Sequence, residues 1–207
     1  GNSTPDLTNA SFDSNAQITL DGTNDYIDLG SYLTGIDTSV LSIELVFRSN
    51  IGTGGYMPLL GWMENEYPHG YICTGNFTGY WGNESISFYN EGPGTTGLSF
   101  AYTNGHAFLN DSNYHHVVFI LQTGAYKIYV DGSEVAVNGG FRNGSMSTTM
   151  PSNLFGYGST PSVAVGAGSS PAAYANARIP VVKIYNRVLT SGDVRNNFNF
   201  YKGRFGM

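Results

Sequence analysis

Charged residues are scarce in this sequence. Only 12% of its 207 residues are Asp, Glu, Lys or Arg, the formal net charge is -6, and no cluster of Lys or Arg occurs. A surface that binds a phosphate backbone needs clustered positive charge. We therefore expect no nucleic acid among the partners of this chain.

Cysteine is nearly absent, and long hydrophobic runs are absent as well. Cys73 is the only cysteine, so neither an intrachain disulfide nor a cysteine-rich metal site can form. We expect Cys73 to be a small, buried apolar side chain. No apolar run approaches the roughly 20 residues that a membrane-spanning helix needs, so no membrane partner is expected.

The residues that are abundant favour strands and turns. The chain holds 28 Gly, 15 Tyr and 12 Phe, whereas Lys, Glu and Arg, which favour helices, are few. The alternation of apolar and polar residues predicts strands at His115–Leu121 and Ala125–Val130. The pair Asp131-Gly132 is typical of a tight hairpin turn and leads into a third strand at Glu134–Val137. Three successive antiparallel strands predict a meander.

Further short strands are predicted at intervals of about 8–12 residues. They cover residues 17–20, 25–29, 41–48, 57–62, 70–74, 77–81, 85–89, 98–102, 163–167 and 179–185. The alternating residues predict that two sheets cover each other, with Ile43, Phe47, Val118 and Ile128 in a common interior.

One helix is predicted near the end of the chain, from about Ser191 to Phe200. Thr190 and Asp193 have the spacing of a capping box, and Val194 and Phe198 share the face that would dock on a sheet. Residues 1–14 are interpreted as a lead-in segment, 15–207 as a single domain, and 138–162 as a long surface loop. The predicted fold class is an all-β sandwich of two antiparallel sheets with one short C-terminal helix.

Four motifs follow one another along the chain: Leu20–Ile27, Ser42–Phe47, His115–Val118 with Tyr129–Gly132, and Lys183–Thr190. They resemble the motifs of laminin-G-like modules of the concanavalin A-like lectin/glucanase superfamily. Phe47 and Tyr114 stand where that family usually has Trp. The resemblance implies a concanavalin A-like jelly-roll sandwich over nearly the whole chain.

The last residues carry a second resemblance. Asn197–Gly206 is similar to the end of C-terminal modules of tailed-bacteriophage structural proteins, and Gly1–Thr4 is similar to the segment that precedes the opening motif in those modules. This resemblance implies a place on a virion surface, outside cells. It also implies other virion subunits, or further copies of the chain, as partners.

A structural calcium ion is the one metal that the family resemblance implies. Asp21 and Asp25 match the acidic positions of the opening motif, and carboxylates are the ligands that Ca²⁺ prefers. The family often adds a third Asp, where this sequence has Pro180. The other interpretation is that both carboxylates cap turns by accepting backbone hydrogen bonds. No other cofactor is expected.

Catalytic residues are not predicted. Glycosidases of this fold need two carboxylates about 5–9.5 Å apart. The glucanase branch of the family places them in an E-x-D-x-x-E or E-x-D-x-E pattern, and this sequence has neither. Glu64-Asn65-Glu66 is the nearest substitute. His115 and His116 point to opposite faces of a strand, one predicted in the core and one at the surface, so they cannot chelate a metal together. We expect that the chain is not an enzyme, with a glycoside hydrolase as the alternative.

Carbohydrate binding is the sharper hypothesis. Aromatic rings stack on the apolar faces of sugars, and carboxylates and amides bond the hydroxyl groups. Exposed residues of this kind are predicted in a loop at residues 64–69 and near residue 80. The candidate residues are Glu64, Glu66, Tyr67, His69, Tyr80 and Trp81.

The predicted function is that of a non-catalytic virion surface module, in capsid decoration or associated with a tail or fibre, that mediates adhesion or recognises glycans. The alternatives left open are a lectin module of a secreted protein, and aromatic residues that serve only the core or contacts between subunits.

Overall fold

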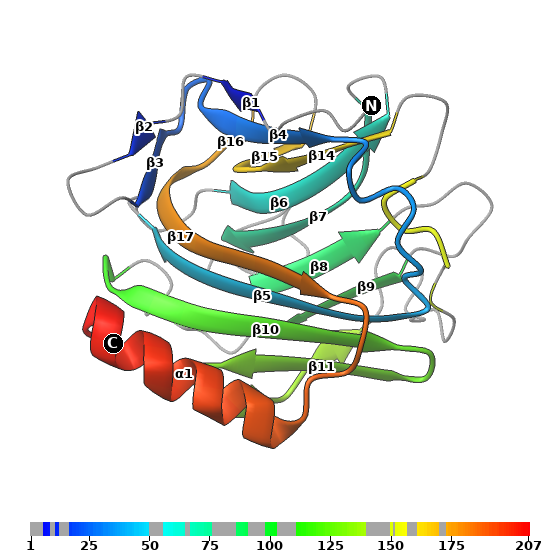
Figure 1. Ribbon diagram of the computed structural model, residues 1–207, viewed down its shortest axis with the longest axis vertical. Helices are drawn as coiled ribbons and strands as arrows, with labels where there is room; N and C mark the ends of the chain where they lie inside the picture. The colour runs from blue at the N-terminus through cyan, green and yellow to red at the C-terminus, as the bar shows by residue number, and fades with distance from the viewer. Residues whose placement is uncertain are drawn as a thin grey trace.

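Two antiparallel sheets face one another, and one helix lies outside them (Figure 1). This computed structural model describes residues 6–8, 11–12, 17–49, 56–64, 67–75, 86–90, 98–102, 111–139, 150, 152–156, 161–169 and 173–207. The predicted fold class is confirmed. The predicted strand at 77–81 lies outside the described residues.

One sheet has seven strands in the described part of the chain. Their order is β12 (Ser133–Val135), β11 (Ala125–Val130), β10 (Tyr114–Gln122), β5 (Val40–Ser49), β17 (Asn176–Tyr185), β3 (Ile18–Asp21) and β2 (Ser11–Phe12). The predicted meander is β10, β11 and β12. Its second turn has Asp131 and Gly132 at φ 49° and 80°, the left-handed geometry that a two-residue hairpin turn needs.

The facing sheet has eight described strands. Their order is β1 (Asp6–Thr8), β4 (Tyr26–Gly30), β14 (Pro161–Val165), β6 (Tyr56–Glu64), β7 (Tyr67–Gly75), β8 (Ile86–Asn90), β9 (Leu98–Tyr102) and β13 (Asn138–Gly139). A small ribbon of β15 (Ala167–Ser169) and β16 (Ala173–Tyr174) lies beside it. The predicted lead-in segment thus contributes β1 to one sheet and β2 to the other. The predicted loop over 138–162 contains β13 and the start of β14.

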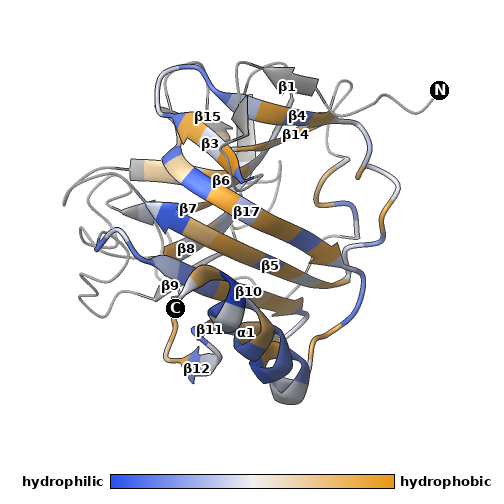
Figure 2. Cartoon of the chain, turned by 60° about the vertical axis from the view of Figure 1, so that its left-hand side comes forward, coloured by the Kyte–Doolittle hydropathy of each residue, from blue (hydrophilic) through white to orange (hydrophobic). Residues whose placement is uncertain are grey.

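The core lies between the two sheets. Ile43, Phe47 and Ile128 are fully buried in one cluster, as predicted. Phe88 of one sheet meets Phe119 of the other, with ring centroids 6.3 Å apart. Hydrophobic residues follow most of β5 (Figure 2). Each large side chain buried in this way stabilises the fold by roughly 1.5–3 kcal/mol.

Val118 is the exception to the predicted interior, and that prediction was wrong. It lies on the outer face of the seven-stranded sheet, in a second cluster with Ile120 and Tyr129. The cause is the helix α1 (Ser191–Phe205), which covers this face (Figure 1). Strand β10 is therefore buried on both faces.

Helix α1 begins as predicted and ends five residues later than predicted. Thr190 and Asp193 form the capping box, and Gly206 ends the helix at φ 70°. The positive charges of Lys202 and Arg204 in the last turn interact favourably with the negative end of the helix dipole. No helix among the described residues is both long and apolar enough to cross a bilayer.

Candidate functional site

The predicted sugar site falls on the hairpin of β6 and β7 in the eight-stranded sheet. The backbone register pairs Glu64 with Tyr67, so these two positions face each other across the last pair before the turn. Directly opposed residues of an antiparallel pair share one face of a sheet, with Cβ atoms about 4.5–5.5 Å apart. The hairpin therefore brings a carboxylate position and an aromatic position together.

The predicted loop at 64–69 is wrong in this respect. Glu64 ends β6, and Tyr67, Pro68 and His69 belong to β7. Only two residues separate the end of β6 from the start of β7. Glu66, Tyr80 and Trp81 lie outside the described residues, so their part in the site stays a prediction.

A β-bulge interrupts the hairpin next to this pair. Trp62 pairs with Gly70 and Met63 pairs with Pro68, so β7 has one extra residue, His69, at this point. Bulges of this kind bend the strand, change the direction of nearby side chains and often lie beside binding sites. His69 is thus the residue of β7 that has no directly opposed partner on β6 at this point.

A rigid base of buried rings supports the hairpin. The indole of Trp62 is 1% exposed, lies between Phe88 and Phe155 at centroid distances of 5.3 and 5.6 Å, and donates a hydrogen bond to Asn90 Oδ1 over 3.0 Å. A Cβ atom on Gly70 would come within 2.4 Å of the indole, so this position requires glycine. The base fixes where the strands emerge from the core.

Tyr71 and Tyr89 lie on the outer face of the same sheet. They face each other in register, with stacked rings 5.0 Å apart, and alternate with Ile72 and Phe88 of the interior. Their exposed fractions are 2% and 5%. These rings are buried and cannot stack on a sugar in this structure.

The two carboxylates of the opening motif cap their turn. Asp25 Oδ2 accepts a hydrogen bond from the Asp21 amide over 3.0 Å, and Asp21 Oδ1 accepts one from the Thr23 amide over 2.7 Å. The turn-capping interpretation is confirmed. Among the described residues, no group of three or more His, Cys, Asp or Glu is placed to hold a metal ion.

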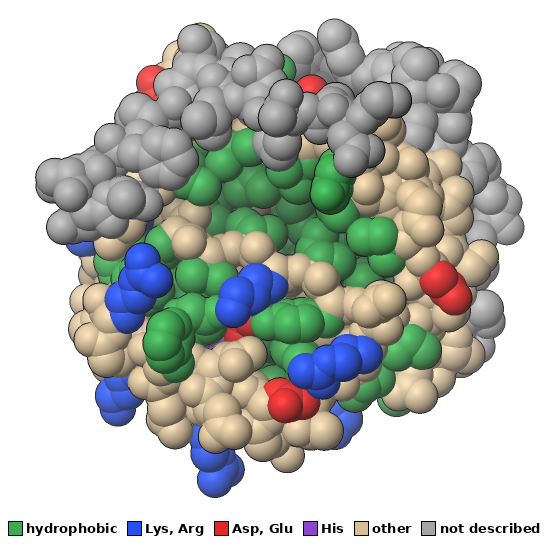
Figure 3. Space-filling model, viewed as in Figure 1, with side chains coloured by type: hydrophobic (Ala, Val, Ile, Leu, Met, Phe, Trp, Pro, Cys, Tyr) green, Lys and Arg blue, Asp and Glu red, His purple; other side chains and the backbone are tan. Residues whose placement is uncertain are grey.

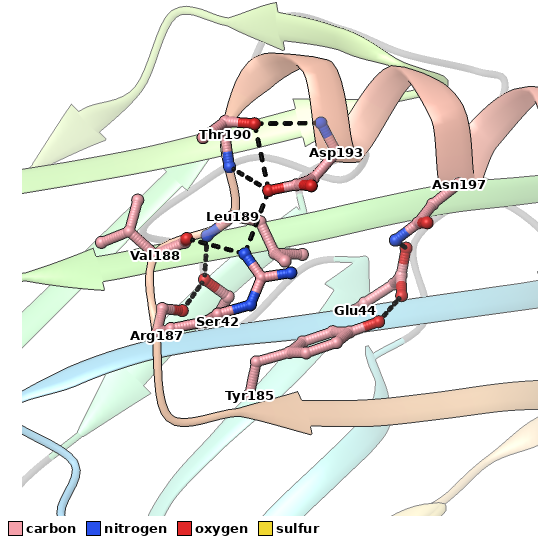
Figure 4. A network of polar contacts seen from close by, with 9 residues as sticks. All are labelled: Ser42, Glu44, Tyr185, Arg187, Val188, Leu189, Thr190, Asp193 and Asn197. Atoms are coloured by element: carbon pink, nitrogen blue, oxygen red, sulfur yellow. Dashed lines mark hydrogen bonds and ion pairs between the residues drawn. The ribbon is translucent and has the colours of Figure 1, made fainter.

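A partly buried polar network lies between α1 and the seven-stranded sheet (Figure 4). Glu44 accepts hydrogen bonds from His116 Nε2 at 2.8 Å, from Asn197 Nδ2 at 2.8 Å and from the Tyr185 hydroxyl at 2.6 Å. Burial alone would raise the pKa of Glu44, but the hydrogen bonds from these three donors outweigh it and hold the pKa below its ordinary value.

The same network fastens the start of the helix. Ser42 Oγ donates to the Arg187 carbonyl at 2.7 Å and accepts from the Leu189 amide at 3.0 Å. Arg187 also reaches the carboxylate of Asp193 at 3.0 Å (Figure 4). These contacts join the final motif of the sequence to β5.

Both histidines of the His115-His116 pair are buried, so the prediction of one at the surface was wrong. His116 is 0% exposed because α1 covers its face of β10, and His115 is 7% exposed. His115 Nδ1 lies 2.9 Å from Asp131 Oδ2 and its Nε2 lies 3.2 Å from Asp111 Oδ1. Sequence reasoning missed this cluster, although Asp111 stands four residues before His115.

We expect His115 to stabilise the fold more at acidic than at alkaline pH. Burial would lower the pKa of His115, but hydrogen bonds and charges from Asp131 and Asp111 outweigh it and raise the pKa above the ordinary value. The stabilisation is therefore complete below about pH 6.5, the unfolded pKa, and is lost as the pH rises through the folded pKa. Urea unfolding of the wild type and of His115→Gln from pH 5.5 to 9 measures the contribution of His115 to the free energy of unfolding.

The difference in unfolding free energy between these two proteins should shrink as the pH rises. A difference that stays constant over this range would contradict the expected charge on His115.

Comparison with known proteins gives a family and a set of similar folds. Residues 21–195 match the family described as the concanavalin A-like lectin/glucanases superfamily. This range covers most of both sheets and the start of α1. No curated protein sequence matches the chain significantly.

Solved structures with a similar fold include receptor-binding domains of botulinum neurotoxins. The binding domain of botulinum neurotoxin DC in complex with rat synaptotagmin II is 11% identical, has a TM-score of 0.64, and aligns with 94% of this chain and 45% of that one. The type C structure described as "dependent upon interaction with two ganglioside molecules" is 12% identical, with a TM-score of 0.63 and coverage of 94% and 45%. The type G receptor binding domain is 11% identical, with a TM-score of 0.62 and coverage of 96% and 46%.

This chain spans less than half the length of those neurotoxin chains. At this level of identity, the likeness shows the fold alone.

Proposed function

Because the chain belongs to the concanavalin A-like lectin/glucanases superfamily, we propose that it is a non-catalytic binding module that recognises glycans through the β6–β7 hairpin. The single observation that carries this proposal is the register that sets Glu64 opposite Tyr67. A ring that stacks on the apolar face of a sugar and a carboxylate that accepts its hydroxyl groups form a minimal sugar site.

The bulge and the buried Trp62 beside the hairpin favour a binding site that is preorganised, with its geometry already formed in the absence of the glycan. The bulge at His69 and the Trp62 base beneath it lie within a few residues of the pair. Groups held in position by a rigid sheet lose little conformational entropy on binding. The sequence adds Glu66, Tyr80 and Trp81 as candidates for the same site, outside the described residues.

The similar structures add support of a coarser kind. One neurotoxin structure is described as depending on two ganglioside molecules, and another as a complex with SialylT. Those descriptions concern the neurotoxins. They support the proposal because they are consistent with sugar recognition on this fold, which by itself does not determine function.

The proposal includes a setting and excludes catalysis. The setting is a virion surface, in capsid decoration or at a tail or fibre, and its support is the resemblance of residues 197–206 to phage structural modules. The proposal of no enzymatic activity is supported by the missing carboxylate pattern of glucanases in the sequence. Turnover of a β-glucan that is lost on Glu64→Gln would contradict it.

A glycan array tests the site. We expect the wild type to bind at least one glycan, and Tyr67→Ala or Trp81→Ala to weaken that binding roughly tenfold or more, the loss typical of an aromatic contact at the centre of an interface. Tyr32→Ala is the matched control, since Tyr32 is a tyrosine 62% exposed in another part of the chain.

Equal thermal midpoints for the variants and the wild type would show that the loss is not due to unfolding. Binding that survives both Tyr67→Ala and Trp81→Ala would contradict the proposed site. If the wild type binds no glycan, while copies of the chain bury well over ~1,000 Å² between them, the alternative of a purely structural module is favoured.

A further inference from the structure

An apolar hollow opens between the two sheets on the side of β4 and β17 (Figure 3). Its volume is about 430 Å³. Every described side chain that lines it is apolar. They are Ile18, Ile27, Leu29, Leu33, Val165, Ile179, Pro180, Val182 and Ile184.

Strand β17 forms one wall of the hollow. Over half of its length, this strand has a described neighbouring strand on one side but not on the other. β17 pairs with β5 as far as Tyr185, but with β3 only at Asn176–Arg178 (Figure 1). Among the described residues, no strand and no other backbone group pairs with the far side of Val181–Tyr185. We call these five residues the open edge of β17.

The open edge has the chemistry of a strand acceptor. In an antiparallel sheet, every second residue turns its N–H and C=O away from its partner strand. Within the described part of the chain, the open edge therefore presents a row of backbone groups that no other strand pairs with. All of its residues are partly or fully exposed, and Lys183 is its only charged residue. Only another extended backbone can form hydrogen bonds with all the N–H and C=O groups of such a row.

The hollow and the open edge share residues of β17. Val182 and Ile184 line the hollow, while Lys183 between them lies on the opposite face of the sheet. Its Nζ atom is 5.2 Å from the ring centroid of Tyr201. Lys183 has no ion pair among the described residues. A strand added here would face the hollow with alternate residues and face Lys183 with the residue between them.

We infer that the open edge of β17 binds an extended peptide segment of a partner protein as an added strand. The segment carries apolar side chains at the two positions that face the hollow and an acidic residue opposite Lys183. The apolar described residues of the hollow match the apolar positions. The Lys183 ammonium group, which has no ion pair within the described part of the chain, matches the acidic one. This site is separate from the proposed glycan site and does not depend on it.

Charge also argues against a second copy of the chain as the occupant. If two open edges paired symmetrically and antiparallel, the central residue Lys183 would lie opposite its own copy. Like charges at directly opposed positions destabilise a pair of strands. Lys183 therefore disfavours self-pairing and favours an acidic partner.

Three labelled synthetic peptides with the same flanks test the inference. The first has the core Thr-Val-Glu-Val-Thr, the second has Lys in place of Glu, and the third has the first sequence with alternate backbone amides N-methylated. We expect the wild-type protein to bind the first peptide roughly three- to tenfold more tightly than the second, and the third not at all.

Protein variants make the test specific. Lys183→Glu is expected to reverse the preference between the Glu and Lys peptides, whereas Lys202→Glu, the same change at an exposed lysine of α1, leaves it unchanged. Equal binding of the N-methylated peptide, or an unchanged preference in Lys183→Glu, would overturn the inference. So would failure of all three peptides to bind, or a dimer in sedimentation experiments that excludes the first peptide from this edge.

Discussion

Replacing Glu44 with alanine is expected to lower the free energy of unfolding by roughly 3–5 kcal/mol. The carboxylate is fully buried and accepts hydrogen bonds from His116, Tyr185 and Asn197. Without it, the three donors lose their common acceptor, and His116, which is 0% exposed, cannot turn to water instead. Removal of one member of a buried network costs more than the network contributes as a whole, because the remaining polar groups stay desolvated.

Chemical unfolding at neutral pH measures this effect, and hydrogen exchange of the α1 amides shows whether the helix loosens first. Glu134→Ala is the matched control, because Glu134 is an exposed carboxylate that also accepts from a tyrosine and from Lys127. Its loss should be much smaller, as for other exposed ion pairs. A loss below about 1 kcal/mol for Glu44→Ala would contradict the importance of the network.

The same carboxylate gives the network a pH dependence with a definite sign. The folded pKa of Glu44 lies below its ordinary value. The stabilisation is therefore present above the unfolded pKa and is lost as the pH falls through the folded one. It acts in the opposite direction to His115, whose contribution fades at alkaline pH.

The strands that could be predicted from the sequence are those with a local signal at both ends. Ala125–Val130 was predicted at its observed bounds, since a glycine turn precedes it and Asp131-Gly132 follows. The strand predicted at 41–48 is longer by one residue at each end. In these segments, the period of two and the turn residues indicate the same structure.

The sequence could not show which face of a strand meets the main core. Val117 and Val118 are both apolar and fully buried, yet one faces the other sheet and the other faces α1. A run that is apolar at every position is typical of a strand buried on both sides. The run from Val117 to Leu121 contained this signal, but only the docked helix explains it.

The open edge of β17 depends on the order of strands, which arises from pairings between segments far apart in the chain. Strand β17 lies next to β5, more than 100 residues away in sequence. Pro180 was the one local signal, since proline within a strand indicates an edge or a bulge. The register does shift there, between Arg178 and Val181. The β6–β7 hairpin joins neighbours in sequence, and strands were predicted there at 57–62 and 70–74, although both are longer than predicted.

Replacing Trp62 with alanine is also expected to destabilise the protein by roughly 3–5 kcal/mol, the range for a large aromatic side chain removed from a core. Its indole contacts Phe88 and Phe155 and covers Gly70. The substitution leaves a cavity that these neighbours cannot fill without moving the two strands of the hairpin. It also leaves Asn90 Oδ1 without the indole donor.

Graded substitutions separate these causes. Trp62→Phe keeps a ring but removes the donor, so its loss should fall to roughly 1–3 kcal/mol, the cost of a buried polar group left unpaired. Phe200→Ala is the control, because Phe200 is 67% exposed and its removal should change the unfolding free energy by no more than about 0.5 kcal/mol. Equal losses for Trp62→Ala and Trp62→Phe would mean that the hydrogen bond, and not the packing of the ring, holds the hairpin. In that case the polar contact to Asn90 would be what fixes Glu64 and Tyr67 relative to the core.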